Sequence, residues 1–362
     1  MKIIKNKKLS DYIQLLVDIN QINMSVSDML SSTINNAEII NEDTFNLAKK
    51  NFPNRKDKEI VAYAIFNYLE LDSDIEEHYS FLEDDLLPSI NALNEIDYTN
   101  NPYYKNIRIP KVSVGEYSLD MDKYFPLEIF PYLDMGVKED YLETNSLGFF
   151  KKDFYFAVLK HQDVTWMSVT PNEIETMKKA VKEASGKVLV YGLGLGYYPY
   201  MISLKEEVKE ITIIEKDSNI IQLFIENILP QFKYKDKIKI VHDDAFKYMK
   251  TSPKFDYIFV DLWHDAFDGI LTYVAFKKGE RSDCKYFYWL ESSFYLLLRR
   301  CFITLIEEQL QNKGDKFYKN GKTPTDDIIN LYYAKTKNLT IISEAQLNNL
   351  LTDKSLLDLL IK

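Results

Sequence analysis

Residues 187–291 alternate short apolar segments with segments of helical periodicity, and this alternation constrains the fold more than any other feature of the chain. Helices are predicted at residues 197–207 and 218–229, between and beside buried strands at 187–191, 210–215, 237–242, 255–261 and 286–290. Strands that alternate with helices form βαβ units, which build a parallel sheet with helices on both faces. We therefore predict an α/β fold with a Rossmann-like core, whose ligands bind at the carboxyl ends of the strands.

A glycine-rich turn follows the first predicted strand and contains Gly192, Gly194 and Gly196. Glycine lets the backbone approach a ligand closely, and the N-terminus of the following helix favours polar or anionic groups. A dinucleotide-binding fingerprint would need a further glycine at position 197, where this chain has Tyr197. The turn therefore favours a nucleoside-type ligand over a dinucleotide.

Three acidic residues follow successive predicted strands. Glu215 ends the second strand, Asp244 and Ala245 follow the third, and Asp261 ends the fourth. A carboxylate at the first position can accept hydrogen bonds from ribose hydroxyls, and one at the second from an adenine amino group. Each acid alone is equally typical of a helix N-cap. Together, at one edge of a sheet beside a glycine turn, they predict a nucleoside-cofactor site.

These segments resemble the successive motifs of class I S-adenosylmethionine-dependent methyltransferases over residues 170–291. The similarity lies in Val-Leu-Val-Tyr-Gly-Leu-Gly-Leu-Gly at 188–196 and Phe-Asp-Tyr-Ile-Phe-Val-Asp at 255–261, together with the acids between them. The resemblance implies S-adenosylmethionine as the cofactor and Asp261 at the reaction centre. It also implies that the cofactor contacts are made by Gly192, Gly194, Gly196, Tyr197, Glu215, Asp244, Ala245 and Asp261.

Two features are instead similar to the spermidine synthases, which are relatives that transfer aminopropyl groups. Val190 stands where many methyltransferases carry an acid, and predicted strands within 147–169 precede the core. The Asp-x-x-Asp of those enzymes has one extra residue here, between Asp261 and Asp265. The main hypothesis is thus a methyltransferase acting on a small molecule or a protein side chain. The alternatives are an aminopropyltransferase and a non-catalytic nucleoside-binding or protein-interaction module.

Catalysis is assigned to two residues at the end of the fourth predicted strand. Asp261 can hold and orient an amine, and His264 can take a proton near neutral pH. The other histidines have no metal-ligand spacing with the cysteines, so no metal site is predicted.

The excess of acidic residues is confined to the first 150 residues, which hold 26 acids and 14 bases. Nucleic-acid backbones require lysine and arginine surfaces, so a nucleic-acid partner is disfavoured. A cationic acceptor such as a polyamine or a lysine side chain fits this charge better. A homo-oligomer is compatible with the sequence.

Four regions are predicted along the chain. They are an acidic helical domain (1–110), a strand-rich connector and hairpin (111–169), the Rossmann-like core (170–291) and a C-terminal helical segment (292–362). The core should open with a helix that has Thr170 as N-cap, Pro171 at its first position and Glu173 completing a capping box.

The chain is predicted to be a soluble cytoplasmic protein. It has only Cys284 and Cys301, which fits a reducing compartment. The basic start at residues 1–8 is followed by polar residues rather than the apolar segment of a signal peptide. No apolar stretch approaches the roughly 18 residues that a membrane helix needs.

Overall fold

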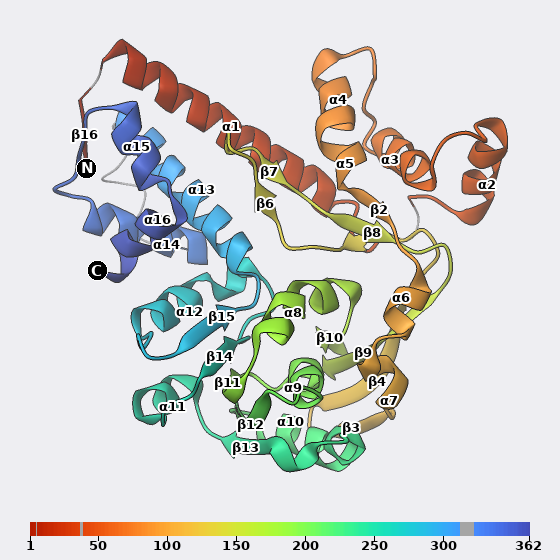
Figure 1. The fold of residues 1–362 in the computed structure, drawn as a ribbon. Helices are drawn as coiled ribbons and strands as arrows, with labels where there is room; N and C mark the ends of the chain where they lie inside the picture. The colour runs from red at the N-terminus through yellow and green to blue at the C-terminus, as the bar shows by residue number, and fades with distance from the viewer. Residues whose placement is uncertain (5, 37–38, 312–321) are drawn as a thin grey trace.

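The computed structural model describes residues 1–4, 6–36, 39–311 and 322–362. Its central sheet has five parallel strands in the order β13-β12-β11-β14-β15. The strands are β11 (Gly186–Tyr191), β12 (Val208–Glu215), β13 (Ile238–His242), β14 (Tyr257–Val260) and β15 (Lys285–Tyr288). The predicted α/β class and Rossmann-like core are therefore confirmed (Figure 1).

The strand order reverses at β11, which lies between β12 and β14. In the parallel register, Tyr191 at the end of β11 pairs with Ile214 on one side and Val260 on the other. The carboxyl ends of these three strands therefore meet at one edge. This is the switch point at which open α/β sheets bind ligands.

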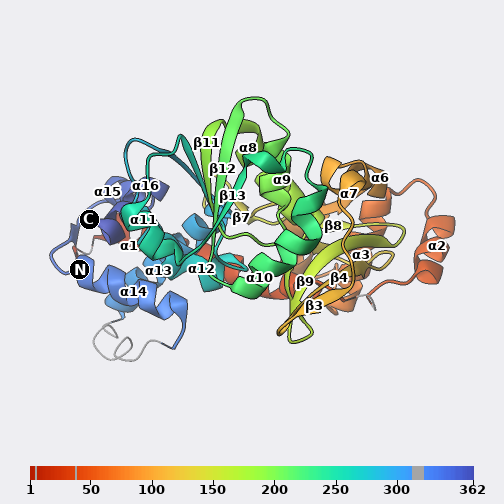
Figure 2. The ribbon, with the colours of Figure 1, turned by 90° about the horizontal axis from the view of Figure 1, so that it is seen from below.

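Helices cover both faces of the sheet, as Figures 1 and 2 show. One face carries α8 (Pro171–Glu183), α9 (Tyr197–Ser203) and α10 (Ser218–Leu223), and the other carries α11 (Ala245–Thr251), α12 (Ala266–Lys278) and α13 (Glu291–Leu310). The helix predicted at 197–207 ends earlier, because the chain turns at Leu204 and Lys205 donates to the carbonyl of Ile202. The helix predicted at 218–229 continues from α10 as a π-helical turn, η2 (Phe224–Ile228). Short 3-10 turns η3 (Leu229–Gln231) and η4 (Lys235–Lys237) then lead into β13.

An antiparallel sheet precedes the core, as the extended pattern of the connector predicts. Its order is β10-β9-β4-β3, with β3 (Val112–Val114), β4 (Tyr117–Tyr124), β9 (Phe154–His161) and β10 (Val164–Ser168). The β9–β10 hairpin turns at Gln162 and Asp163, which both have positive φ. Because β10 leads almost directly into α8, the hairpin lies beside the glycine turn of the core, and the sulfur of Met167 is next to Gly194.

The N-terminal helices share two apolar cores. The first half of α1 (Lys7–Ser31) packs with the Rossmann-like and C-terminal parts, whereas its second half packs with the other N-terminal elements. These are α2 (Glu42–Asn51), α3 (Asp57–Tyr68), α4 (Glu76–Ser80), the π-helical η1 (Phe81–Leu86), α5 (Leu87–Ser89), β2 (Ile90–Ala92) and β8 (Leu147–Phe149). Helix α1 therefore joins both cores, and the four-region division stays a prediction.

Smaller elements complete the N-terminal half. Two short helices, α6 (Glu95–Thr99) and α7 (Pro102–Asn106), connect it to the hairpin sheet. Strand β5 (Phe130–Pro131) pairs with β8, and β6 (Gly136–Val137) pairs with β7 (Glu143–Thr144).

The two termini lie together (Figure 1). Strand β1 (Lys2–Ile3) pairs in parallel with β16 (Thr340–Ile341), which lies between α14 (Pro324–Lys335) and α15 (Glu344–Leu350). The chain ends in two helices after Ser343, because Thr352 caps a separate α16 (Asp353–Ile361) that follows α15. Across the described ranges, no helix combines the length and apolar character needed to cross a bilayer.

Candidate active site

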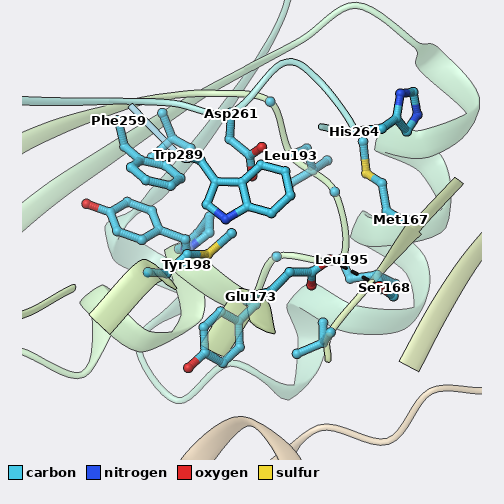
Figure 3. Close-up of a pocket in the computed structure, with 18 of the residues that line it drawn as sticks. Met167, Ser168, Glu173, Leu193, Leu195, Tyr198, Phe259, Asp261, His264 and Trp289 are labelled. Atoms are coloured by element: carbon cyan, nitrogen blue, oxygen red, sulfur yellow. Dashed lines mark hydrogen bonds between the residues drawn. The ribbon is translucent and has the colours of Figure 1, made fainter. Parts of the chain in front are cut away.

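A cavity of about 220 Å³ opens at the switch point of the sheet (Figure 3). The glycine turn and the ends of β11 and β14 form one side, and the end of β10 and the first turn of α8 form the other. Its lining includes Ser168, Glu173, Gly192, Leu195, Tyr198, Phe259, Asp261 and Trp289. A second cavity of about 200 Å³ adjoins it and shares Gly192 and Asp261 with it.

The glycine turn has the backbone that the sequence predicts. Gly192 has φ +95°, and a Cβ added there would lie 2.0 Å from the carbonyl oxygen of Asp261. Gly196 has φ +72°, and a Cβ there would lie 2.3 Å from the ring of Phe224. Both positions therefore need glycine for conformation and for space. This close approach brings the turn against the end of β14, where Asp261 is located.

Glu215 is held at the end of β12 by backbone amides. One carboxylate oxygen accepts from the amides of Lys216 and Asp217 at 2.8 and 2.9 Å, and the other accepts from Leu193 at 3.2 Å. Glu215 lines the second cavity together with Asp244 and Ala245. The structure thus brings together these three sequence-predicted residues at one edge of the sheet, next to the glycine turn.

Asp244 also stabilises the start of a helix, as its position after a strand allows. It is the N-cap of α11, and its side chain accepts from the amide of Lys247 at 3.0 Å. The capping bond uses one carboxylate oxygen, so the other is available to the cavity that Asp244 lines.

Two carboxyl groups, Asp261 from the end of β14 and Glu173 from the first turn of α8, line the first cavity (Figure 3). The hydroxyl of Ser168 donates to Glu173 at 3.1 Å. Burial raises the pKa of Asp261 to about 7. Burial, together with the nearby charge of Asp261, raises the pKa of Glu173 to about 8. At neutral pH this pair of carboxyls therefore retains protons that ordinary surface carboxyls have lost.

No lysine or arginine is among the described residues that line this cavity. Ionising two carboxyls without a basic partner is unfavourable in a low-dielectric site, because two buried negative charges repel each other and lose their hydration. A ligand that carries a positive charge would supply the missing partner and allow ionisation. The electrostatics of the cavity therefore favour a cation.

His264 lies at the rim of the site and lines both cavities. Its Nδ1 is 2.7 Å from a carboxylate oxygen of Asp268, and its ring makes an edge contact with Trp166 at a centroid distance of 4.2 Å. In Figure 3 the ring is turned away from Glu173 and Asp261. The catalytic role of His264 stays a prediction.

Aromatic side chains form the walls of the first cavity. The ring of Tyr198 stacks on Phe259 at 3.9 Å, and its buried hydroxyl has no hydrogen-bond partner among the described residues. Trp289 donates from Nε1 to the hydroxyl of Thr176 at 2.9 Å. Tyr197, a predicted cofactor contact, also lines the cavity, and its hydroxyl accepts from Asn101 at 3.1 Å.

The capping box predicted at the start of α8 forms only in part. Thr170 is the N-cap and Pro171 occupies the first turn, but the Thr170 side chain makes no capping hydrogen bond. The carboxyl group of Glu173 accepts from the backbone of Thr170 and also lines the cavity, where Ser168 supplies its side-chain partner. An acid in the first turn of a helix is equally typical of a cap, so sequence reasoning missed Glu173 as a site residue.

Asp265, the second acid after β14, does not line either cavity. It caps α12 by accepting from the amides of Phe267 and Asp268 at 2.8 and 2.9 Å.

Trp263 packs in the apolar core, and its Nε1 donates to the carbonyl of Trp289 at 3.2 Å. Within the described part of the chain, no three histidine, cysteine or acidic residues are grouped as metal ligands.

The core has a mixed α/β fold with a parallel sheet and helices, consistent with a Rossmann-like core of the methyltransferase type. Within that fold, residues 170–269 match the family model of the spermine/spermidine synthase domain. The match covers the glycine turn, the three acids and the start of α12.

A solved structure that the chain matches in part is the spermidine synthase from Thermotoga maritima, at 18% sequence identity and a TM-score of 0.30. The alignment covers 40% of this chain and 54% of that one, so this chain spans about half the length of that protein. No curated protein sequence matches the chain significantly.

Proposed function

We propose that the chain transfers an aminopropyl group from decarboxylated S-adenosylmethionine to an amine acceptor. The observation that carries this proposal is the pair of carboxyls of Glu173 and Asp261 in a cavity that no lysine or arginine of the described ranges lines. The adjoining cavity holds the acids expected for a nucleoside. The match to the spermine/spermidine synthase domain supports aminopropyl transfer better than the methyl transfer that the sequence motifs favoured.

The second cavity has side chains that fit the nucleoside part of this donor. The Glu215 oxygen that accepts only from Leu193 retains a lone pair for a ribose hydroxyl. Asp244 and the partly buried ring of Phe246 line the same space and suit an adenine. When bound, the donor supplies a carbon that is activated by the neighbouring sulfonium.

The first cavity discriminates between donors by charge. The amino-acid tail of S-adenosylmethionine carries a carboxylate, which would meet two acids there and, within the part of the chain that the structure describes, no lysine or arginine. The decarboxylated tail carries only an ammonium. Because a buried like-charge contact is unfavourable and an opposite-charge contact is favourable, the cavity favours the decarboxylated donor.

Asp261 and Glu173 would also prepare the acceptor. Their carboxylates can hold an alkylammonium group and orient its nitrogen toward the shared boundary of the two cavities at Gly192. The nitrogen attacks only after it loses a proton. A carboxylate whose pKa is raised to about 7 accepts that proton far more readily than an ordinary one. Tyr198 and Trp289 would exclude water and provide ring faces for the cation.

Glu173 takes the place that Asp265 would have in an Asp-x-x-Asp arrangement. The extra residue after Asp261 leaves Asp265 at the N-terminus of α12 and outside both cavities. The second carboxyl of the reaction centre comes instead from α8. This assignment makes the aminopropyl proposal compatible with the altered spacing.

Methyl transfer is the second candidate, favoured by the glycine turn and the acids at the strand ends. The two reactions leave different nucleoside products from different donors. Purified protein would be incubated with either donor and a panel of diamines and monoamines, and the products would be identified by mass spectrometry. We expect methylthioadenosine and an aminopropylated amine; S-adenosylhomocysteine alone would overturn the proposal in favour of methyl transfer.

Variants test the role of the carboxyl pair. We expect Asp261→Asn and Glu173→Gln each to lower kcat/KM by about 100-fold or more, the scale of a lost acid–base group. The matched control is Glu183→Gln on the same helix, whose carboxylate pairs with Lys285 away from the cavity. If calorimetry shows that the donor binds, but no amine of the panel yields a product, the result would support a non-catalytic nucleoside-binding module instead.

A further inference from the structure

A groove unrelated to the candidate active site runs along the N-terminal helices. One wall is the second half of α1 and the other is the continuous helix formed by α4 and η1 (Figure 1). The cavity has a volume of about 890 Å³. Leu71 and Leu142 close it at the ends of neighbouring segments.

The groove has an apolar floor. On α1, Ile22, Val26 and Met29 recur at helical spacing and face it, and Phe81 does the same from η1. Ile22 is 48% exposed, which is unusual for an isoleucine in the middle of a long helix. The flexible thioether of Met29 lets such a surface adapt to different side chains.

The rim of the groove is predominantly acidic. Its carboxylates belong to Asp18, Glu76, Glu77, Asp84 and Asp85, whereas Lys138 is the single lysine or arginine among the described residues that line it. None of these five acids forms an ion pair with a described residue. Burial raises the pKa of Asp85 despite the opposing effect of Lys138, so the acids outnumber the positive charge that the groove itself provides.

The dimensions suit a helix. Residues 18–29 of α1 line the groove over eleven residue steps, which correspond to about 16 Å or three helical turns. Two helical walls around an apolar floor are the arrangement in which proteins bind an amphipathic helix through its apolar face. The acidic rim selects the charge of that helix, because lysine and arginine flanking the apolar face would meet the uncompensated carboxylates.

We propose that this groove, between residues 18–29 and residues 76–85, binds a basic amphipathic helical segment of a partner protein. The apolar stripe of the partner packs on Ile22, Met29 and Phe81, and its basic flanks meet the acids of the rim. The proposal is independent of the transfer reaction, since none of these residues lines either active-site cavity.

A model peptide tests the proposal on the full chain. The probe is a fluorescent peptide of about 18 residues, or five helical turns, with leucine at helical spacing and lysine elsewhere. Its binding is followed by fluorescence anisotropy at physiological ionic strength. A scrambled peptide of the same composition has the same charge without the apolar face. We expect micromolar binding of the patterned peptide and at least about tenfold weaker binding of the scrambled one.

Matched variants locate the binding site. Glu76→Lys/Glu77→Lys reverses two exposed acids in the first turn of α4 and should weaken binding by about tenfold or more. The control, Glu42→Lys/Asp43→Lys, makes the same charge change at the first two residues of α2, which lie outside the groove. For the apolar floor, Ile22→Ser should weaken binding, whereas Leu15→Ser on the same helix, also exposed but outside the groove, should not.

Several results would overturn the proposal. Equal binding of both peptides, or equal loss in both charge-reversed variants, would mean that only net charge attracts the probe. Absence of binding would remove the groove as a helix site. If the chain self-associates, and Glu76→Lys/Glu77→Lys abolishes this without affecting peptide binding, the groove is an interface between copies of the chain.

Discussion

The hydroxyl of Ser168, the last residue of β10, donates a hydrogen bond of 3.1 Å to the carboxyl group of Glu173 in the first turn of α8. The bond connects the β9–β10 hairpin to the acid that shares the cavity with Asp261. The position of Glu173 therefore depends on the hairpin, and the candidate active site extends beyond the Rossmann-like core.

Replacing Glu173 should change how stability depends on pH. Its pKa is raised from the ordinary 4.5 to about 8, so the folded protein binds a proton that the unfolded chain has lost between these values. Stability from this group is thus present below pH 4.5 and is lost as the pH rises to 8. In urea unfolding, the free energy of unfolding of Glu173→Gln should rise relative to the wild type by about 4 kcal/mol between pH 5 and 8.5. Glu183→Gln should show no such rise, because Lys285 lowers the pKa of Glu183 instead of raising it. A pH profile of Glu173→Gln parallel to that of the wild type would contradict the prediction.

Two glycines of the turn should differ in their tolerance of alanine. Gly192→Ala places a Cβ 2.0 Å from a backbone oxygen, which cannot move without distorting β14. Gly194→Ala meets the sulfur of Met167 at 3.1 Å, and this flexible side chain can shift. The φ of Gly194, +51°, lies in the left-handed region that alanine can adopt, whereas the +95° of Gly192 lies outside it, so backbone strain adds to the steric clash at Gly192. We expect a loss of about 1 kcal/mol for Gly194→Ala and more than about 3 kcal/mol for Gly192→Ala in thermal unfolding.

Much of the core could be predicted from the sequence, because parallel strands buried on both faces appear as short apolar runs. Once the strands are placed, the site residues Glu215, Asp244 and Asp261 can also be predicted, because each comes at or just after the end of a strand and these ends lie at one edge of the sheet.

The lengths of α9 and α10 were harder to predict. Their ends depend on a turn at Leu204 and on the π-helical η2, which periodicity does not reveal.

Contacts between distant segments could not be predicted. Glu173 is separated from Asp261 by most of the core sequence, and only the folded hairpin shows that its carboxyl group lines the cavity as well as meeting the start of the helix. The same holds for Tyr197, whose hydroxyl partner Asn101 lies in the N-terminal half. The acidic composition of that half was evident, but the apolar floor beneath it depends on how α1 packs against η1.

Glu215→Gln should separate the structural and ligand-binding roles of this carboxylate. The amide oxygen can still accept from Lys216 and Asp217, so the end of β12 should keep its conformation. The amide nitrogen cannot accept from Leu193 or from a ribose hydroxyl. We expect a loss of about 1–2 kcal/mol in stability, and an affinity for decarboxylated S-adenosylmethionine, measured by calorimetry, that is lower by about tenfold or more. Unchanged affinity would exclude Glu215 from the donor site.

Removing one partner of the buried ion pair between Arg300 on α13 and Glu143 on β7 should destabilise the fold more than removing both partners. Nε and Nη2 of Arg300 contact both oxygens of Glu143, whose side chain is only 5% exposed. Arg300→Leu leaves that carboxylate buried without its partner, and we expect a loss of about 3–5 kcal/mol in urea unfolding at pH 7. Arg300→Leu/Glu143→Leu removes the unpaired charge and should recover part of the loss. The exposed pair of Lys187 and Glu210 is the control, since Lys187→Leu should cost less than about 1 kcal/mol. A double variant as unstable as Arg300→Leu alone would show that the arginine acts through packing rather than through its pairing with Glu143.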